Sequence, residues 1–291
     1  MKKILTTYCL HHSWINLGLV FISLFGFQLL NIIYGFEVED SGFHLVAYEH
    51  IFDAPECIVY NFTCYLTNVV GGMVIKLFPS IGILGFRIMG ALSVLFTMFI
   101  IYVALKKEIP LIHFLIGFTL VIFSYIKAPY SFNNGILSCC LYALSIIVLY
   151  KGLIKDNPVL VLIGGVIVGL NLFSSIPNVL AIGMIIIILY NKIVFLEGKK
   201  YDWNNSCFFI VGVVLGIFVV LSFMMYYGPV GLFIHSLFYL FSVASGDSSH
   251  GLLMQFKIHF AFYLLALIPV LILYALCRID EKSGNNGNNI I

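Results

Sequence analysis

Long apolar runs dominate the chain, and each is about as long as a bilayer is thick. An α-helix rises about 1.5 Å per residue, so roughly 20 residues cross a hydrocarbon core about 30 Å thick. Because 62% of the 291 residues are hydrophobic and only 10% are charged, these runs fit lipid and not water. The sequence therefore predicts an all-α, polytopic membrane helix bundle of about eight transmembrane helices, at 14–35, 83–105, 109–127, 134–150, 158–176, 178–196, 207–227 and 258–277.

Charge and motif content exclude several other classes of protein. The formal net charge of +2 is too small for a polyanion-binding surface, so no nucleic acid partner is expected. The seven cysteines form no CxxC pair, which argues against a zinc module. The GxSxG, HExxH, Walker and GxGxxG motifs of hydrolases, metalloproteases and nucleotide-binding proteins are also missing from the sequence.

The positions of the basic residues predict the orientation in the membrane. With the N-terminus inside, eleven of the fifteen Lys and Arg residues fall at cytoplasmic ends of the expected spans. This bias predicts an even number of crossings with both termini cytoplasmic. The four remaining basic residues fall at or near the external side: Lys76, Arg87, Lys127 and Lys257.

Two further apolar stretches are expected to lie in the interface and not to cross. Residues 61–78 contain several polar residues and Lys76, but their apolar positions recur at helical spacing on one face. Residues 232–244 are only about 13 long, which favours an interfacial or re-entrant helix. The chain is thus expected to form one membrane domain over 1–280, with a first external loop at 35–82, a last one at 228–257, and a disordered tail at 281–291.

The first external loop concentrates the acidic residues. Six of the thirteen Asp and Glu residues lie there: Glu37, Glu39, Asp40, Glu49, Asp53 and Glu56. Residues 43–52 read as a short amphipathic helix with Phe43, Val46, Ala47 and Ile51 on one face, and with His44 and Glu49 pointing elsewhere. The acidic cluster is either a solvated loop or a site for a proton or a metal. Asp40 is the favoured candidate, because it follows the first span closely enough to meet a lipid headgroup and a soluble acceptor together.

Basic groups on the external side are the natural partners of a phosphate. Arg87 can grip phosphate oxygens in a bidentate manner, although snorkelling to the interface is the alternative. Lys76 and Lys257 are either phosphate ligands or interface anchors. His250 lies in a small polar loop beside Asp247 and is either a ligand or merely solvated. Cys57 and Cys64 are either a disulfide pair or two free thiols.

This layout resembles the membrane-embedded glycosyltransferases of the GT-C fold. The shared features are one helix, an external loop with an acidic motif near its start and two interfacial helices, and then a long series of spans. Local likenesses are Tyr130-Ser131-Phe132-Asn133-Asn134, Ser174-Ser175-Ile176-Pro177-Asn178 and Asp247-Ser248-Ser249-His250. The resemblance covers about residues 10–278 and is closest to the dolichyl-phosphate-mannose and arabinosyl/rhamnosyl-type transferase group, of which this chain would be a short or truncated member.

The resemblance implies a hexosyl- or pentosyltransferase of the cell envelope. It would move a sugar from a polyprenyl-phosphate carrier to a glycan, lipid or protein acceptor on the outer face of the cytoplasmic membrane. Asp40, with Glu39 as its neighbour, matches the acidic position that acts as base or helps to hold a divalent cation. Arg87, with His250, Lys257 or Lys76, would bind the donor. The alternative is a non-catalytic component of polysaccharide export or polymerisation, or an inactive transferase-like scaffold.

Overall fold

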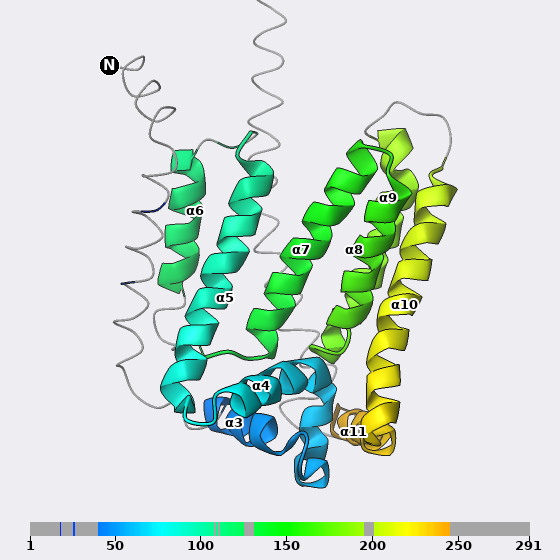
Figure 1. Ribbon diagram of the computed structural model, residues 1–291. Coiled ribbons are helices and arrows are strands. Elements are labelled where there is room, and N and C mark those ends of the chain that lie inside the picture. The colour runs from blue at the N-terminus through cyan, green and yellow to red at the C-terminus, as the bar shows by residue number, and fades with distance from the viewer. Residues whose placement is uncertain are drawn as a thin grey trace, which may run out of the picture. The chain divides into compact units, whose positions relative to one another are not determined.

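The computed structural model describes residues 18, 26, 40–107, 109, 111–124, 131–194 and 201–244. The chain divides into two compact units, Met1–Ser236 and Leu237–Ile291, and the description that follows concerns the first. All regular elements within the described ranges are helices (Figure 1). In chain order they are α3 (Asp40–His50), η1 (Pro55–Cys64), α4 (Tyr65–Leu77), α5 (Gly82–Leu105), α6 (Leu111–Ser124), α7 (Asn134–Ile154), α8 (Pro158–Asn171), η2 (Ile176–Gly183), α9 (Met184–Val194), α10 (Trp203–Tyr227) and α11 (Val230–Ala244).

Three of these helices, α5, α7 and α10, are long and apolar enough to cross a membrane. They have 24, 21 and 25 residues, and they confirm the predicted runs 83–105, 134–150 and 207–227 as helices. Capping residues are present at the start of α7 and at the end of α10. Asn133 caps α7 by accepting a hydrogen bond from the backbone of Ile136 at 3.0 Å, and Gly228 follows α10 in the left-handed conformation. The structure is that of a helical membrane protein.

The other predicted spans are only partly described. The runs 109–127, 158–176 and 178–196 contain shorter helices, namely α6, α8, and η2 followed by α9. Because α8 ends at Asn171, its predicted end at residue 176 is wrong. The runs 14–35 and 258–277 lie outside the described residues except for Gly18 and Gly26, as does the tail 281–291. The total of eight spans, like the single domain over 1–280, stays a prediction.

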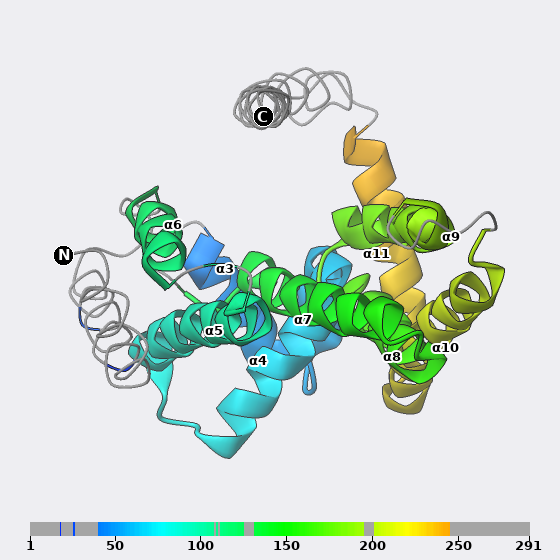
Figure 2. The same ribbon diagram turned by 90° about the horizontal axis from the view of Figure 1, so that it is seen from above.

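Helices α5, α7, α8 and α10 pack side by side in that order, as the view from above shows (Figure 2). The closest pair is α8 with α10, where glycines face glycines. An added Cβ on Gly165 or Gly169 would lie only 2.3 Å from a carbonyl oxygen of α10, and the glycines of α10 meet α8 in the same way. Small residues at this spacing let two backbones approach closely.

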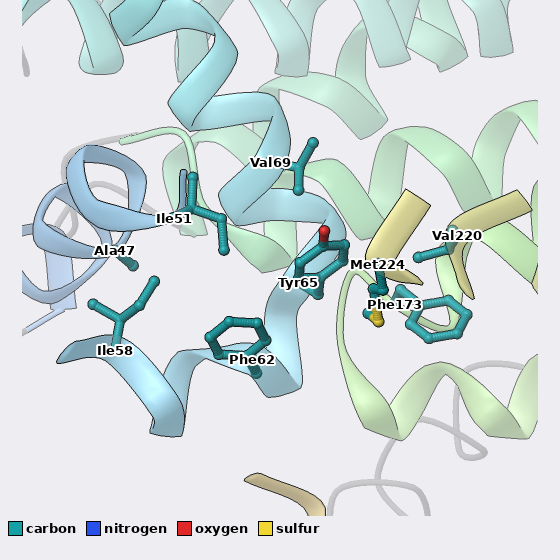
Figure 3. Close-up of a cluster of buried hydrophobic side chains, with 9 residues drawn as sticks. All are labelled: Ala47, Ile51, Ile58, Phe62, Tyr65, Val69, Phe173, Val220 and Met224. Atoms are coloured by element: carbon teal, nitrogen blue, oxygen red, sulfur yellow. The ribbon is translucent and has the colours of Figure 1, made fainter. Parts of the chain in front are cut away.

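The segment α3–η1–α4 gathers at the end of this row where α5 and α7 begin and α8 and α10 end (Figure 1). Figure 3 shows Phe62 and Tyr65 of this segment beside Phe173, which follows α8, and Met224 of α10. The backbone N–H of Leu66 donates to the Phe173 carbonyl oxygen at 2.8 Å. The first loop is therefore packed onto the bundle as part of its core.

Helix α4 confirms the predicted helix within 61–78, but it starts at Tyr65, because residues 55–64 form the 3-10 helix η1. Its buried residues include Thr67, Asn68, Gly71 and Gly72, the positions whose polarity argued against lipid. These residues face protein. Whether α4 lies in the membrane interface stays a prediction.

Candidate functional site

Helix α3 packs on the bundle through Ala47, Tyr48 and Ile51, which are buried, whereas Phe43 and Val46 are exposed. The predicted apolar face of Phe43, Val46, Ala47 and Ile51 is thus divided between side chains that are buried in protein and side chains that are not. Exposed apolar side chains are tolerated where a helix meets lipid, so the packing partners and not hydropathy alone select the buried face.

Tyr48 fixes α3 to the bundle. Its hydroxyl donates to the carbonyl oxygen of Phe132 at 2.9 Å, and its ring lies 5.1 Å from the ring of Phe86. Phe132 in turn donates its backbone N–H to the Phe86 carbonyl oxygen at 2.9 Å. On the other side, an added Cβ at Gly71 would stand 2.4 Å from the Tyr48 ring. Burial, followed by the nearby Cys64 thiol, raises the pKa of Tyr48, so this side chain acts as a neutral structural anchor.

Arg87 lies beside this anchor, directly after Phe86 and near the start of α5. Its side chain is buried, with only 7% of the residue exposed. A snorkelling residue keeps its charged group in water, so the observed burial disagrees with the snorkelling alternative. A buried guanidinium is stabilised by hydrogen bonds or by an opposite charge.

His44 is the residue that sequence reasoning missed. It was expected only to point away from the apolar face of α3, and its ring stacks on Tyr48 with 6.0 Å between centroids and 20° between planes. Its Nδ1 atom is buried, while the residue as a whole is partly exposed. The i, i+4 spacing of His44 and Tyr48 was the available signal.

Asp40 is the first residue of α3, and only its backbone is described. Residues 40, 44 and 48 are spaced by four, so they occupy one side of the helix. The position of Asp40 is thus on the side that leads to His44, Tyr48 and the start of α5. Glu39, His250 and Lys257 lie outside the described residues.

Lys76 lies at the other end of α3. Its Nζ is 3.4 Å from Oδ1 of Asp53 and 4.5 Å from the centroid of the Phe52 ring. Both charged side chains are largely exposed, at 56% and 70%. Helix α3 has 11 residues and is about 15 Å long, so the fold separates Lys76 from Asp40.

A buried polar network occupies the break between α8 and η2. The side-chain amide of Asn178 donates to the Ser138 hydroxyl and to the Asn171 backbone carbonyl, both at 2.8 Å, and to Oδ1 of Asn171 at 3.2 Å. Tyr142 donates to the Asn178 carbonyl at 3.4 Å. The motif Ser174-Ser175-Ile176-Pro177-Asn178 marked this place in the sequence, but its burial was not predictable from it.

Helix α4 closes the same break from the other side. Thr67 donates its hydroxyl to the carbonyl oxygen of Ser174 at 3.3 Å, in addition to the backbone bond of Leu66. Thr67, Asn68 and Ser174 are completely buried. The side chains here replace the backbone bonds that the interrupted helix loses.

The two cysteines of the first loop are free thiols in this structure, Cys57 exposed and Cys64 half-buried. Burial raises the pKa of the Cys64 thiol, against the opposing effect of hydrogen bonds with Thr63 and Asn134. Cys64 is thus a protonated thiol that packs beside Tyr48.

A second polar cluster stands at the opposite end of the bundle, where α10 begins. Asp202 caps α10, and the buried Asn205 donates its side-chain amide to Asp202 at 2.8 Å and to Asp156 at 3.1 Å. Asp156 has a positive φ of 46° in the turn that joins α7 to α8. These bonds hold the α7–α8 turn to the start of α10, which is a structural role.

A hollow of about 460 Å³ opens between the second half of α4 and α5. Apolar side chains line it, among them Val74, Phe78, Met89 and Phe96. Its hydroxyl, from Ser93, is occupied by a hydrogen bond to the Met89 carbonyl at 2.8 Å. Val74 and Met89 also pack against the Tyr48–Phe86–Phe132 cluster, so the hollow adjoins the start of α5 where Arg87 lies.

The predicted divalent cation has Asp40 and Glu39 as its candidate ligands. Among the side chains that the structure describes, no three His, Cys, Asp or Glu residues come together as a metal site. Glu39 and the Asp40 side chain lie outside that part of the chain, so the divalent cation stays a prediction.

No family model, no curated protein and no solved structure matches this chain. The fold and the site define it as a helical membrane protein whose first loop packs a short helix, α3, against the start of α5.

Proposed function

We propose that the protein is a membrane glycosyltransferase that moves a sugar from a polyprenyl-phosphate carrier to an extracytoplasmic acceptor. The supporting observation is the placement of α3, which begins at Asp40, against the start of α5, where Arg87 is buried. An acidic and a cationic residue are thus brought to one end of an otherwise apolar bundle. The proposed setting is the cytoplasmic membrane, with both termini inside and this end outside, as the lysine bias suggests.

The chemistry is an in-line displacement at the anomeric carbon. Asp40 accepts the proton of the acceptor hydroxyl while its oxygen forms the new bond to that carbon. The bond between the anomeric carbon and the phosphate oxygen breaks, and its electron pair leaves with the phosphate. Arg87 stabilises the developing phosphate charge, since guanidinium binds phosphate with two parallel hydrogen bonds. His250 or Lys257 would assist from the last external loop.

The hollow beside α5 suits the lipid part of the donor. Its lining is apolar, and it adjoins the cluster that carries Phe86, the neighbour of Arg87. A hydrocarbon chain in the hollow would leave its phosphate near the start of α5. Lys76 is paired with Asp53 at the surface in this structure, and Arg87 is the phosphate ligand that the proposal uses.

The deciding experiment compares Asp40→Asn with Asp53→Asn in the purified protein in proteoliposomes. Asp53 is an exposed carboxylate of the same loop, so its variant is the matched control. The probes are radiolabelled undecaprenyl-phosphate hexoses and pentoses, with membrane extract as acceptor. We expect Asp40→Asn to lower transfer at least about 100-fold, the lower range for loss of a general base, and Asp53→Asn to stay near the wild-type rate.

Two outcomes would contradict the proposal. Transfer by Asp40→Asn at the wild-type rate would show that the base lies elsewhere. Absence of transfer by the wild-type protein with every donor would favour the alternative, a non-catalytic scaffold or export component.

A further inference from the structure

The imidazole of His44 stands one helical turn after Asp40 and is held there by packing. Tyr48, on which it stacks, is clamped between Phe86 and Gly71 and bonded to the Phe132 carbonyl. The ring of Phe43 meets His44 edge-on, with centroids 6.2 Å apart.

A carboxylate next to an apolar surface has difficulty in releasing a proton once it has taken one. Desolvation disfavours the charged form of a carboxyl group and raises its pKa. A base that works at each turnover must nevertheless return to its ionised form. Imidazole exchanges protons with water near neutral pH, and His44 combines a buried Nδ1 with a partly exposed ring.

We infer that His44 is a positioning residue that takes the proton from Asp40 after each sugar transfer and releases it to water. This inference rests on the proposed function. In the step, the O–H bond of the protonated Asp40 carboxyl breaks, a bond from that proton to an imidazole nitrogen forms, and the carboxylate is restored. The imidazolium then loses one proton to solvent, so the protein returns to its starting state.

The elements packed on α3 contribute three other charged or titratable groups, namely Arg87 from α5, Cys64 from η1 and Lys76 from α4. Lys76 is paired with Asp53 beyond the C-terminal end of α3, and the half-buried Cys64 thiol is neutral. On α3 itself, Glu49 is exposed and five residues from His44, and His50 ends the helix. His44 is therefore the described titratable residue one turn from Asp40.

The test separates stacking from proton transfer with two variants. His44→Phe keeps an aromatic ring on Tyr48 and lacks the nitrogens, whereas His44→Ala leaves room for added imidazole. We expect both to lower kcat at least about tenfold with KM nearly unchanged, because general acid–base groups contribute roughly 10²–10⁴-fold. Imidazole in solution should restore part of the rate of His44→Ala and none of the rate of His44→Phe.

A wild-type rate for His44→Phe would overturn the inference, since stacking alone would then suffice. The inference would also be overturned if His44→Ala altered KM and left kcat unchanged, or if added imidazole did not raise the rate of His44→Ala. Loss of transfer in Asp40→Asn together with an active His44→Phe would refute this inference and leave the proposed function standing.

A second measurement does not depend on the identity of the sugar. The pKa of His44 is followed by NMR of histidine-labelled protein in micelles, with His44→Phe used to assign the signal. Replacement of Asp40 by Asn should lower this pKa, because a carboxylate one turn away favours the charged imidazolium. An unchanged pKa would overturn the pairing of the two residues, even if no donor sugar is found.

Discussion

The contact between α8 and α10 should fail when a single methyl group is added to it. Gly169 of α8 faces Gly216 of α10, and an added Cβ on Gly169 would lie 2.3 Å from the Val213 carbonyl oxygen. Real Cβ atoms do not come closer than 3.0 Å to such atoms. Gly169→Ala must therefore move the two backbones apart by at least 0.7 Å, the difference between 3.0 and 2.3 Å.

The expected size of the effect follows from two opposing contributions. Forcing extra atoms into a well-packed interface costs about 1–3 kcal/mol, and a gap of 0.5–1 Å removes roughly a quarter to a half of each dispersion contact along it. Alanine in place of glycine favours the helix by about 0.8–1 kcal/mol. Because the backbone atoms of Val213, Gly216 and Ile217 that the new Cβ would meet cannot rotate away, we expect a net loss of about 1–2 kcal/mol for Gly169→Ala.

The measurement is the free energy of unfolding in mixed micelles, titrated with SDS. Gly117→Ala in α6 is the matched control, since an added Cβ there meets nothing within 4 Å, and it should be neutral or stabilising. The pair Gly169→Ala and Gly216→Ala should cost less together than the sum of the two, because the first change has already separated the helices. If Gly169→Ala stabilised the protein as much as Gly117→Ala, the close approach of α8 and α10 would be refuted.

Two further expectations concern other parts of the molecule. Asn178→Leu should cost about 1–3 kcal/mol in the same titration, because it leaves the buried Ser138 and Asn171 acceptors without their donor. Asn191→Leu is the control, since the buried Asn191 Nδ2 has no hydrogen-bond partner in the described part of the chain and its loss should cost little. Lys76→Met should change the free energy of unfolding by less than about 1 kcal/mol, because the pair with Asp53 is exposed; a larger loss would mean that the pair is shielded.

The sequence predicted the helices better than their contacts. Apolar runs of span length located α5, α7 and α10 to within a few residues, because hydrocarbon imposes the length of a span directly. Hydropathy grouped Phe43 and Val46 with Ala47 and Ile51 on one face of α3, but only Ala47 and Ile51 are buried. Hydropathy does not distinguish a side chain that faces lipid from one that faces protein.

The candidate site shows the same limit. Asp40 and Arg87 stood out in the sequence because charges are rare in such a chain. His44 did not, because Tyr48, on which its ring stacks, is held by Phe86 and Phe132, which lie 38 and 84 residues beyond Tyr48, and only the fold brings them to α3. Residues that act through packing leave no local pattern, whereas residues that act through charge do.

The depth in the membrane of the break between α8 and η2 follows from the length of α10. Trp203 and Tyr226 are exposed near its two ends, and 23 residues of helix span about 35 Å, close to the distance between the two interfaces where aromatic residues gather. Gly216 lies ten residues, or about 15 Å, before Tyr226. Because Gly169 faces Gly216 and α8 runs in the same direction as α10, Asn171 lies two residues, or about 3 Å, closer to the level of Tyr226 and is about 12 Å inside it.

The break between α8 and η2 is therefore expected inside the hydrocarbon layer and not in an external loop. Irregular backbone is tolerated at such depth only where protein covers it. This explains why the Asn178 amide and the Thr67 hydroxyl donate hydrogen bonds to nearby carbonyl oxygens, and why Thr67 and Asn68 of α4 are completely buried. Because Leu66 and Thr67 are bonded to Phe173 and Ser174, the first turn of α4 is expected at the same depth. A loop anchored in this way would hold α3, and the residues at its start, at a fixed height relative to the bundle.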